Sequence, residues 1–292
     1  MANEKKNGSN GTCGYTEEAF LVHYAMRHGT VDGSTSHFHD NYELYYLLSG
    51  QRQYFIRDRV YRIEKGDLVF IPKYDLHRTL DAGPFHERML LYFKDSFLDH
   101  ETGEDEQLKN YVLQPFQRTV PVLRLPKDDR SEAEALFYKI IREMGNKRPG
   151  FQLYVKALVL ELLVLVSRCA EQETESVFDF ETPLQRKVAE ISTFIRQNYK
   201  NPLTLSELSK QFYMSTYYLS RVFKEISGFS FIEYLNYIRI KEAQSLLHDS
   251  DLPIVQIAEL VGFESVANFG RVFKQSVHLS PMQYRKMQRI RT

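Results

Sequence analysis

Residues 219–234, LSRVFKEISGFSFIEY, recur fifty residues later as residues 269–284, FGRVFKQSVHLSPMQY. Both copies carry the tetrapeptide RVFK, which begins at Arg221 in the first copy and at Arg271 in the second. Upstream of the copies the offset falls to 49, so the second turn is predicted to be one residue longer than the first. A repeated helical unit with a basic residue in each copy can place two similar helices on a periodic partner. Duplex DNA is such a partner, since its successive major grooves lie about 34 Å apart.

The two parts of the chain differ in charge. The 292 residues are enough for two domains, and the formal net charge is +0. From Thr182 onward there are 15 Lys and Arg against 9 Asp and Glu, so the preceding part carries an equal excess of negative charge. This asymmetry is expected when one part of a protein meets a polyanion and the other does not. Alone it is weak, because many proteins that bind no nucleic acid share it.

The N-terminus and the cysteines indicate a cytoplasmic protein without a membrane segment. Residues 1–14 begin MANEKKNGSNGT, with no apolar stretch, and are predicted to form a disordered tail rather than a signal peptide. Cys13 and Cys169 lie far apart and have no metal-type spacing, which is typical of proteins in a reducing compartment. The most apolar run, residues 154–169, is interrupted by charged residues and is too short to cross a bilayer.

Residues 15–125 are predicted to form an all-β domain. Short runs rich in Tyr, Phe, Val and Ile alternate with turn residues, and no helical pattern separates them, which favours a barrel or a sandwich. The pattern then becomes helical over residues 126–172. A capping box formed by Ser131 and Glu134 predicts the start of the first helix, and a second helix follows a Pro-Gly turn.

The acidic, weakly patterned residues 173–182 are predicted to link this part to an all-helical segment, residues 183–292. Helix starts in this segment are marked by N-cap residues with Glu or Gln three positions further on. These N-cap residues are Thr182, Thr204, Ser230 and Ser280. In the second repeat, Gly262 stands at the turn between two helices, where a positive φ is easiest for glycine. Tyr213 stands at the matching place in the first repeat and is a departure, because a bulky residue is uncomfortable there.

This helical arrangement resembles the C-terminal domain of the AraC/XylS family of bacterial transcription factors. The resemblance covers about residues 184–284, including the long joining helix with RIKEAQSLL and the closing SPMQYR. It implies two helix-turn-helix units, binding to promoter DNA, and contact with RNA polymerase, more often as an activator than as a repressor. Two units at this spacing are a specific signal, whereas one helix-turn-helix match would be weak.

Each recognition helix must bury one face and present the other to bases and phosphates. In the first helix, Arg221 is expected to contact guanine and Lys224 a phosphate. In the second helix, Gly270 offers no side chain, so readout is expected through apolar contact with a thymine methyl group or through DNA shape. The candidate DNA-binding residues are Ser215, Thr216, Tyr217, Ser220, Arg221, Lys224, Ser265, Val266, Ala267, Gly270, Arg271 and Lys274.

Histidines in the β segment define a second candidate site. His37, His39 and Glu43 lie at alternate positions, so a continuous strand would direct all three to one side. The spacing H-x-H-x3-E-x6-G, and a following G-x5-P before His77, resemble the two metal motifs of cupin barrels. Tyr74 departs from the second motif, which has glycine there. The resemblance implies a barrel in which His37, His39, Glu43 and His77 are candidate ligands for iron, manganese, zinc or nickel.

Three interpretations of the N-terminal domain stay open. In the favoured one it binds a small effector, often a sugar in the family that the chain resembles. The candidate effector contacts are His37, His39, Glu43, Tyr45, His77 and Arg78. In the second interpretation the domain is a metal-dependent dioxygenase or isomerase fused to a DNA reader. In the third, these residues only satisfy strand ends, and the protein binds DNA without a ligand.

The sequence therefore predicts an α+β chain of two domains, a cupin-like β-barrel followed by helices and an all-α domain with two helix-turn-helix units. The predicted function is ligand-responsive transcriptional regulation without catalytic residues, as an activator of genes for carbohydrate or other small-molecule metabolism. The expected partners are double-stranded DNA, a small-molecule effector, RNA polymerase and a second copy of the chain. Residues 126–172 are expected to mediate dimerisation through an apolar stripe. The stripe includes Leu153, Leu160, Leu163 and Val164.

Overall fold

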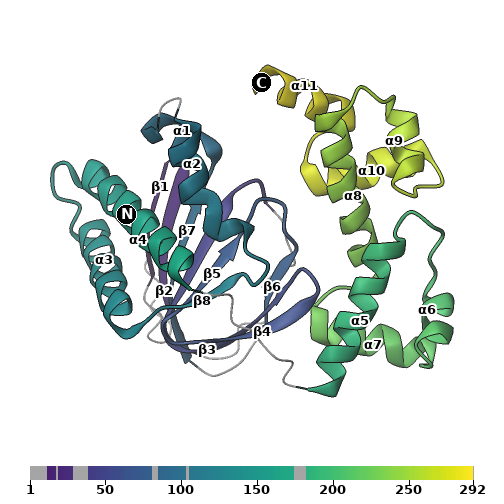
Figure 1. Ribbon diagram of the computed structural model, residues 1–292, viewed down its shortest axis with the longest axis horizontal. Coiled ribbons are helices and arrows are strands. Elements are labelled where there is room, and N and C mark those ends of the chain that lie inside the picture. Colours follow the sequence, from purple (N-terminus) through teal and green to yellow (C-terminus); the bar gives the residue numbers. More distant parts are fainter. Residues whose placement is uncertain are drawn as a thin grey trace, which may run out of the picture. The chain divides into compact units, whose positions relative to one another are not determined.

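The computed structural model describes residues 12–17, 19–28, 39–80, 85–102, 105–173 and 182–291. The chain divides into two compact units, each described separately below. The first contains most of residues 1–179, and the second contains residues 180–292 with the short stretches 36–39 and 55–60. Among the described helices, none combines the length and the apolar character that crossing a bilayer requires. The two-domain α+β fold class is confirmed (Figure 1).

An antiparallel sheet of eight strands is the framework of the first unit. The strands are β1 (Thr12–Thr16), β2 (Phe20–His28), β3 (Tyr42–Ile56), β4 (Arg59–Glu64), β5 (Asp67–Ile71), β6 (His77–Leu80), β7 (Phe85–Phe93) and β8 (Val122–Arg124). Their order is β1-β2-β7-β3-β5-β8, and β4 and β6 also pair with β3. The long strand β3 therefore organises the sheet, because it pairs with four other strands.

Strand β3 changes direction at a glycine. The pairing with β7 shifts register between Leu47 and Ser49, and Gly50 follows with a φ of +89°. A Cβ atom at Gly50 would lie 2.3 Å from the carbonyl oxygen of Phe85, so both the backbone angle and the close approach require glycine.

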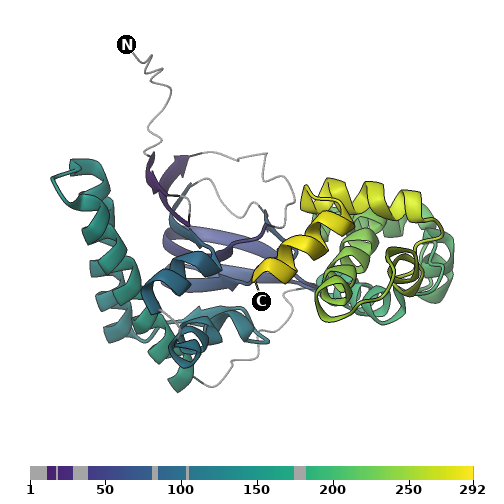
Figure 2. The same cartoon turned by 90° about the horizontal axis from the view of Figure 1, so that it is seen from above.

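Helices cover one face of this sheet. They are α1 (Asp95–Thr102), α2 (Glu106–Leu113), the 3₁₀ helix η1 (Gln114–Gln117), α3 (Lys127–Asn146) and α4 (Phe151–Gln172). Even-numbered β3 residues such as Leu44 and Tyr46 are buried in one core with Phe137 and Leu162 of these helices. Tyr46 stacks on Phe137 with ring centroids 4.5 Å apart. Because strand side chains alternate, the odd-numbered residues of β3 before the register shift, such as Glu43 and Tyr45, occupy the opposite face. Figures 1 and 2 show α3 and α4 along the helix-covered side.

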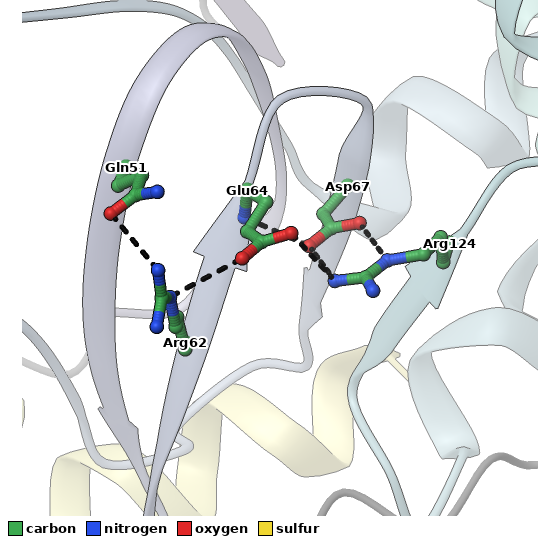
Figure 3. A network of polar contacts seen from close by, with 5 residues as sticks. All are labelled: Gln51, Arg62, Glu64, Asp67 and Arg124. Carbon is green, nitrogen blue, oxygen red and sulfur yellow. Dashed lines mark hydrogen bonds and ion pairs between the residues drawn. The ribbon is translucent and has the colours of Figure 1, made fainter. Parts of the chain in front are cut away.

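A buried carboxylate joins three strands at one end of the sheet (Figure 3). Asp67 is fully buried and accepts two hydrogen bonds from Arg124, at 2.9 and 3.0 Å, and one from the backbone N–H of Glu64 at 2.9 Å. Arg62 extends the network, with contacts to Glu64 at 3.3 Å and to Gln51 at 3.2 Å. The bidentate guanidinium contact compensates the charge of the buried carboxylate.

Three expectations for this unit need correction. Strand β1 begins at Thr12, inside the predicted tail 1–14, whose other residues lie outside the described part of the chain. The predicted all-β segment also contains α1, α2 and η1. Helix α3 begins at Lys127 instead of at the predicted capping box, and the Ser131 hydroxyl donates to the Lys127 carbonyl oxygen from inside the helix. Most of the predicted linker 173–182 also lies outside the described residues.

The second unit consists of helices, with α8 joining two groups of them (Figure 1). The helices are α5 (Pro183–Asn198), α6 (Leu205–Gln211), α7 (Thr216–Ser227), α8 (Phe231–Asp249), α9 (Ile254–Leu260), α10 (Val266–Val277) and α11 (Pro281–Arg291). The pair α6–α7 and the pair α9–α10 are the two helix-turn-helix units. Four residues separate the first pair and five separate the second, which confirms the predicted longer second turn.

The predicted N-caps of this unit are confirmed. Thr182, Thr204 and Ser230 each form a capping box, in which the side chain accepts from the third helical N–H and a Glu or Gln reaches back. The same reciprocal pair joins Ser280 and Gln283. These caps set the ends of the helices that carry the two units.

Candidate DNA interface and effector site

Helix α7 has the two faces that the sequence predicted. Leu219, Val222 and Phe223 are buried, at 1–2% exposure. Of the six candidate DNA-binding residues in the first helix-turn-helix, Ser220 is half-buried and the others are exposed. The exposed ones are Ser215, Thr216, Tyr217, Arg221 and Lys224. Ser215 also caps the helix by accepting from the N–H of Tyr218 at 3.2 Å.

Helix α10 repeats this design. Phe269, Val272 and Phe273 form its buried face, and the Ser265 side chain accepts from the N–H of Asn268 at 3.2 Å. Gly270 is half-buried, and no atom lies within 4 Å of where its Cβ would be. The remaining candidates of this unit are exposed. They are Ser265, Val266, Ala267, Arg271 and Lys274.

The arginines of the two recognition helices, Arg221 and Arg271, make different side-chain contacts. Arg271 donates to Asn268 Oδ1 at 2.9 Å and to Gln275 Oε1 at 3.0 Å, so polar neighbours orient its guanidinium group. The guanidinium of Arg221 instead lies 5.6 Å from the ring centre of Tyr218, within cation–π range. Sequence reasoning missed Tyr218, Asn268 and Gln275. Their helical spacing of three or four residues from each arginine was the available signal.

In the first unit, a buried histidine–carboxylate pair lies on the face of the sheet opposite α3 and α4. Glu43 of β3 is 2% exposed and His77 of β6 is 5% exposed, and Glu43 Oε2 lies 3.1 Å from His77 Nε2. The other ring nitrogen, His77 Nδ1, lies 2.8 Å from the carbonyl oxygen of Asp75, which can only accept a hydrogen bond. Nδ1 therefore carries a proton, and Nε2 faces the carboxylate.

This geometry favours a charged imidazole. Burial alone would lower the pKa of His77. The charge of Glu43, its hydrogen bond and the Asp75 carbonyl together outweigh burial and raise that pKa above its ordinary value. Both ring N–H groups of His77 are engaged in this way, so the pair offers a hydroxyl group of an effector the carboxylate oxygens of Glu43 as acceptors.

His39 completes a three-residue cluster. It precedes β3 by three residues, and one ligand atom from each of His39, Glu43 and His77 lies within 4.8 Å of the others. The 3.1 Å between Glu43 Oε2 and His77 Nε2 is close to the separation of two ligand atoms that each lie about 2.1 Å from the same ion. The hydrogen bond from His77 Nδ1 to the Asp75 carbonyl oxygen is of the kind that orients a metal-ligating histidine. The donor set thus fits a divalent transition metal, which would bind His77 Nε2 in place of the proton there. His37, the fourth predicted ligand, lies outside the described residues.

The two remaining predicted effector contacts, Tyr45 and Arg78, lie on opposite faces of the sheet. Tyr45 follows Glu43 on the same face, is 1% exposed, and its hydroxyl has no hydrogen-bond partner in the described part of the chain. Arg78 is half-buried, and strand alternation directs it to the face opposite that of His77. The structure therefore brings Glu43, His77 and Tyr45 together, and not Arg78.

Sequence reasoning missed two arginines and a neutral histidine on this face. His86 and Arg88 lie on β7, and Arg52 lies on β3 beyond the bend. His86 is 1% exposed, and neither its Nδ1 nor Arg88 Nη1 has a hydrogen-bond partner among the described residues. Burial, and then the charges of Arg52, Arg88 and Arg27, lower the pKa of His86 to about 4. For His86 and Arg88, the available sequence signal was their alternation along β7 with the apolar Met89, Leu91 and Phe93.

Unpartnered buried polar atoms are costly, at about 1–3 kcal/mol each. Proteins keep few of them, and they concentrate where a ligand supplies the missing partner. Tyr45, His86 and Arg88 contribute three such atoms to one face of the sheet. The geometry thus defines a ligand-binding domain attached to a tandem helix-turn-helix DNA reader, the class of a one-chain transcriptional regulator.

Comparison with known proteins supports that class. A family model for the AraC-like ligand binding domain matches residues 23–163, and one for a helix-turn-helix domain matches residues 208–287. The chain is 25% identical over 265 residues to the melibiose operon regulatory protein of Escherichia coli strain K12, covering 87% of this chain and 84% of that protein. It is 20% identical over 249 residues to the HTH-type transcriptional activator RhaR of Mannheimia succiniciproducens, covering 85% and 86%.

Among solved structures, the C-terminal domain of AraT, a response regulator from Geobacillus stearothermophilus, is 36% identical, with a TM-score of 0.35. That match covers 36% of this chain and 88% of the other. On the two family models, the chain belongs to the AraC family, as a ligand-responsive transcriptional regulator that binds DNA and a small-molecule effector.

Proposed function

We propose that this protein is an effector-controlled activator of genes for carbohydrate use. The observation that carries its DNA-binding role is the repeated exposed Arg–Lys pair, Arg221 with Lys224 and Arg271 with Lys274, at the same place on α7 and α10. The names of two relatives, a melibiose operon regulator and a transcriptional activator, support activation and a carbohydrate target. We assign no catalytic residue to the chain, and we place its action in the cytoplasm, as for the bacterial regulators it resembles.

Within the DNA interface, Arg221 reads a base and Lys224 contacts a phosphate. Arg221→Ala is expected to cost roughly 1–3 kcal/mol at the preferred site and to relax the preference at one base pair. Lys224→Ala is the matched control, because loss of a phosphate contact weakens binding equally on all sequences. Titration of both variants against a set of single-base operator changes measures this. Unchanged affinity and unchanged preference in Arg221→Ala would refute the assignment.

The effector binds on the face of the sheet that carries Glu43, Tyr45 and His77. Tyr45 offers a hydroxyl without a described partner, and Glu43, held by His77, offers carboxylate oxygens as acceptors. Effector binding changes the affinity for DNA only if the effector binds two states of the protein unequally. The regulator thus acts by a population shift between a DNA-binding state and a weaker state.

We further propose that the active form is a homodimer and that it contacts RNA polymerase. Two members of the predicted apolar stripe serve the chain's own core, since Leu163 is buried and Leu160 packs against the sheet core. Exposed apolar residues remain on the same pair of helices. They are Tyr138, Leu153 and Tyr154. In a dimer, binding of one DNA-binding region to its half-site would raise the effective concentration of the second region at the neighbouring half-site.

The cluster of His39, Glu43 and His77 favours a second role for the site, as a holder of a divalent transition metal. Such an ion would supply Lewis-acid coordination to oxygen atoms of the effector. Metal analysis of the full chain purified without a histidine tag is expected to show one metal equivalent, and His77→Ala is expected to lose it. A chelator is then expected to lower the melting temperature of the wild type only. Metal-free protein that does not respond to added zinc, iron, manganese or nickel would contradict this role.

A further inference from the structure

The ligand-facing side of the sheet is rich in cations at one end. In the pairing of β7 with its neighbours, His86 lies opposite Arg27 on β2 and opposite Gly50 on β3. Arg52 follows two residues after Gly50 and is 7% exposed, and Arg88 follows two residues after His86 on the same face. Three guanidinium groups therefore surround one buried imidazole.

No carboxylate among the described residues pairs with Arg88, and Arg88 Nη1 has no hydrogen-bond partner there. The nearby Glu43 is engaged by His77 at 3.1 Å. His86 is kept uncharged by its burial and by the arginines, so it can donate or accept without adding to their charge. The end of the site near His86 is thus positive, and the end near Glu43 is neutral and suited to hydroxyl groups.

We propose that the effector is a polyhydroxylated oxyanion, a sugar acid or a sugar phosphate. Its anionic oxygens bind Arg88, Arg52 and His86, and its hydroxyl groups bind Tyr45 and the Glu43–His77 pair. The forked guanidinium group matches the paired oxygens of a carboxylate or a phosphate. A neutral sugar would leave the half-buried Arg88 without a counter-charge among the described residues. This inference rests on the proposed effector-binding role of the same face.

The first test needs no knowledge of the ligand. A cation placed to hold an absent anion is repelled by its neighbours in the ligand-free protein. Arg88→Met is therefore expected to raise the melting temperature of the ligand-free full chain by roughly 2–4 °C. Arg62→Met, at the exposed end of the network in Figure 3, is the matched control and is expected to change it little. A fall in Arg88→Met larger than that in the control would make Arg88 a structural residue and overturn the proposal.

The second test uses matched neutral and acidic ligands. Glucose is compared with glucuronate and glucose 6-phosphate, and galactose with galacturonate and galactose 1-phosphate. At saturation, at least one acid or phosphate is expected to raise the wild-type melting temperature by roughly 5 °C, with no rise from its neutral parent. The sugar acids and the phosphates distinguish the two sources of the oxyanion. Arg88→Met is expected to abolish the rise, and Arg88→Lys to retain part of it.

Two outcomes would overturn the proposal. One is stabilisation by a neutral sugar that persists in Arg88→Met, and the other is a lack of response to all four anions. Operator binding by the same preparation separates this failure from a failure of the proposed function. If DNA binding is retained and no anion binds, only the effector class is wrong. If the protein also fails to bind DNA, the regulatory function itself is refuted.

Discussion

His86 combines nearly complete burial with three neighbouring arginines, and this sets how it responds to acid. Its pKa of about 4 in the folded chain lies below the ordinary value of 6.5. Between these values the unfolded chain binds more protons than the folded chain, so the free energy of unfolding falls as the pH falls from 6.5 towards 4. The slope reaches at most about 1.4 kcal/mol per pH unit.

Urea unfolding at pH 7.5 and pH 5 compares the wild type with His86→Gln, which cannot take up the proton. The wild type is expected to lose about 1–2 kcal/mol more than the variant on acidification, because only in the wild type does the unfolded chain take up a proton at this position that the folded chain excludes. Equal losses in the two proteins would show that His86 titrates normally and that the arginines do not act on it.

At the scale of single residues, strand alternation predicted that His39 and Glu43 share one side, and the resemblance to the cupin motifs added His77, which lies 3.1 Å from Glu43. The same rule applied to β7 would have found His86 and Arg88. Arg52 was harder to predict, because the face that it occupies depends on the register shift before Gly50, where the chain closely approaches Phe85. A local pattern carries no information on such a long-range contact.

At the scale of elements, the two helix-turn-helix units use the same turn geometry with different residues. Gly262 has a φ of +88° and Tyr213 a φ of +55°. A Cβ atom on Gly262 would lie 2.7 Å from the Tyr199 carbonyl oxygen and 2.8 Å from that of Lys200. Tyr213 is 96% exposed, so its side chain contributes little packing in return for an unfavourable backbone angle.

Substitutions at the two turns are therefore expected to have opposite effects. Tyr213→Gly is expected to stabilise the protein by about 0.5–1 kcal/mol, because glycine relieves the left-handed strain. Gly262→Ala is expected to destabilise it by at least about 2 kcal/mol, because the methyl group meets two backbone oxygens. Denaturant unfolding of the full chain measures both. Destabilisation by Tyr213→Gly would contradict the strain at that turn.

Capping chemistry predicted the starts of α5, α6, α8 and α11, since each depends on residues three positions apart. The same motif failed at α3, where Ser131 and Glu134 lie inside the helix. Glu134 instead accepts a hydrogen bond from the Tyr46 hydroxyl at 2.9 Å. Helices α1 and α2 were missed because they interrupt a strand-rich segment, and their apolar residues are selected by packing against the sheet rather than by a long repeating pattern.

At the scale of the whole molecule, the sequence predicted effector binding for the first unit and DNA binding for the second. The duplicated segment led directly to the tandem DNA reader, because both copies keep the buried apolar triplet and the exposed Arg–Lys pair. The ligand face was predicted only in part, since its cations come from three strands distant in sequence. The central claim is that both recognition helices bind one duplex at the same time.

The dependence of DNA affinity on salt tests that claim most directly. DNA is first selected by the full chain from a random-sequence pool, and its affinity is measured over a range of salt concentrations. The logarithm of the affinity is expected to fall linearly with the logarithm of the salt concentration. Lys224→Ala and Lys274→Ala are each expected to reduce the slope by about 1, and the double variant by about 2. A slope that changes in only one of the single variants, or a selection that enriches no sequence, would contradict the claim.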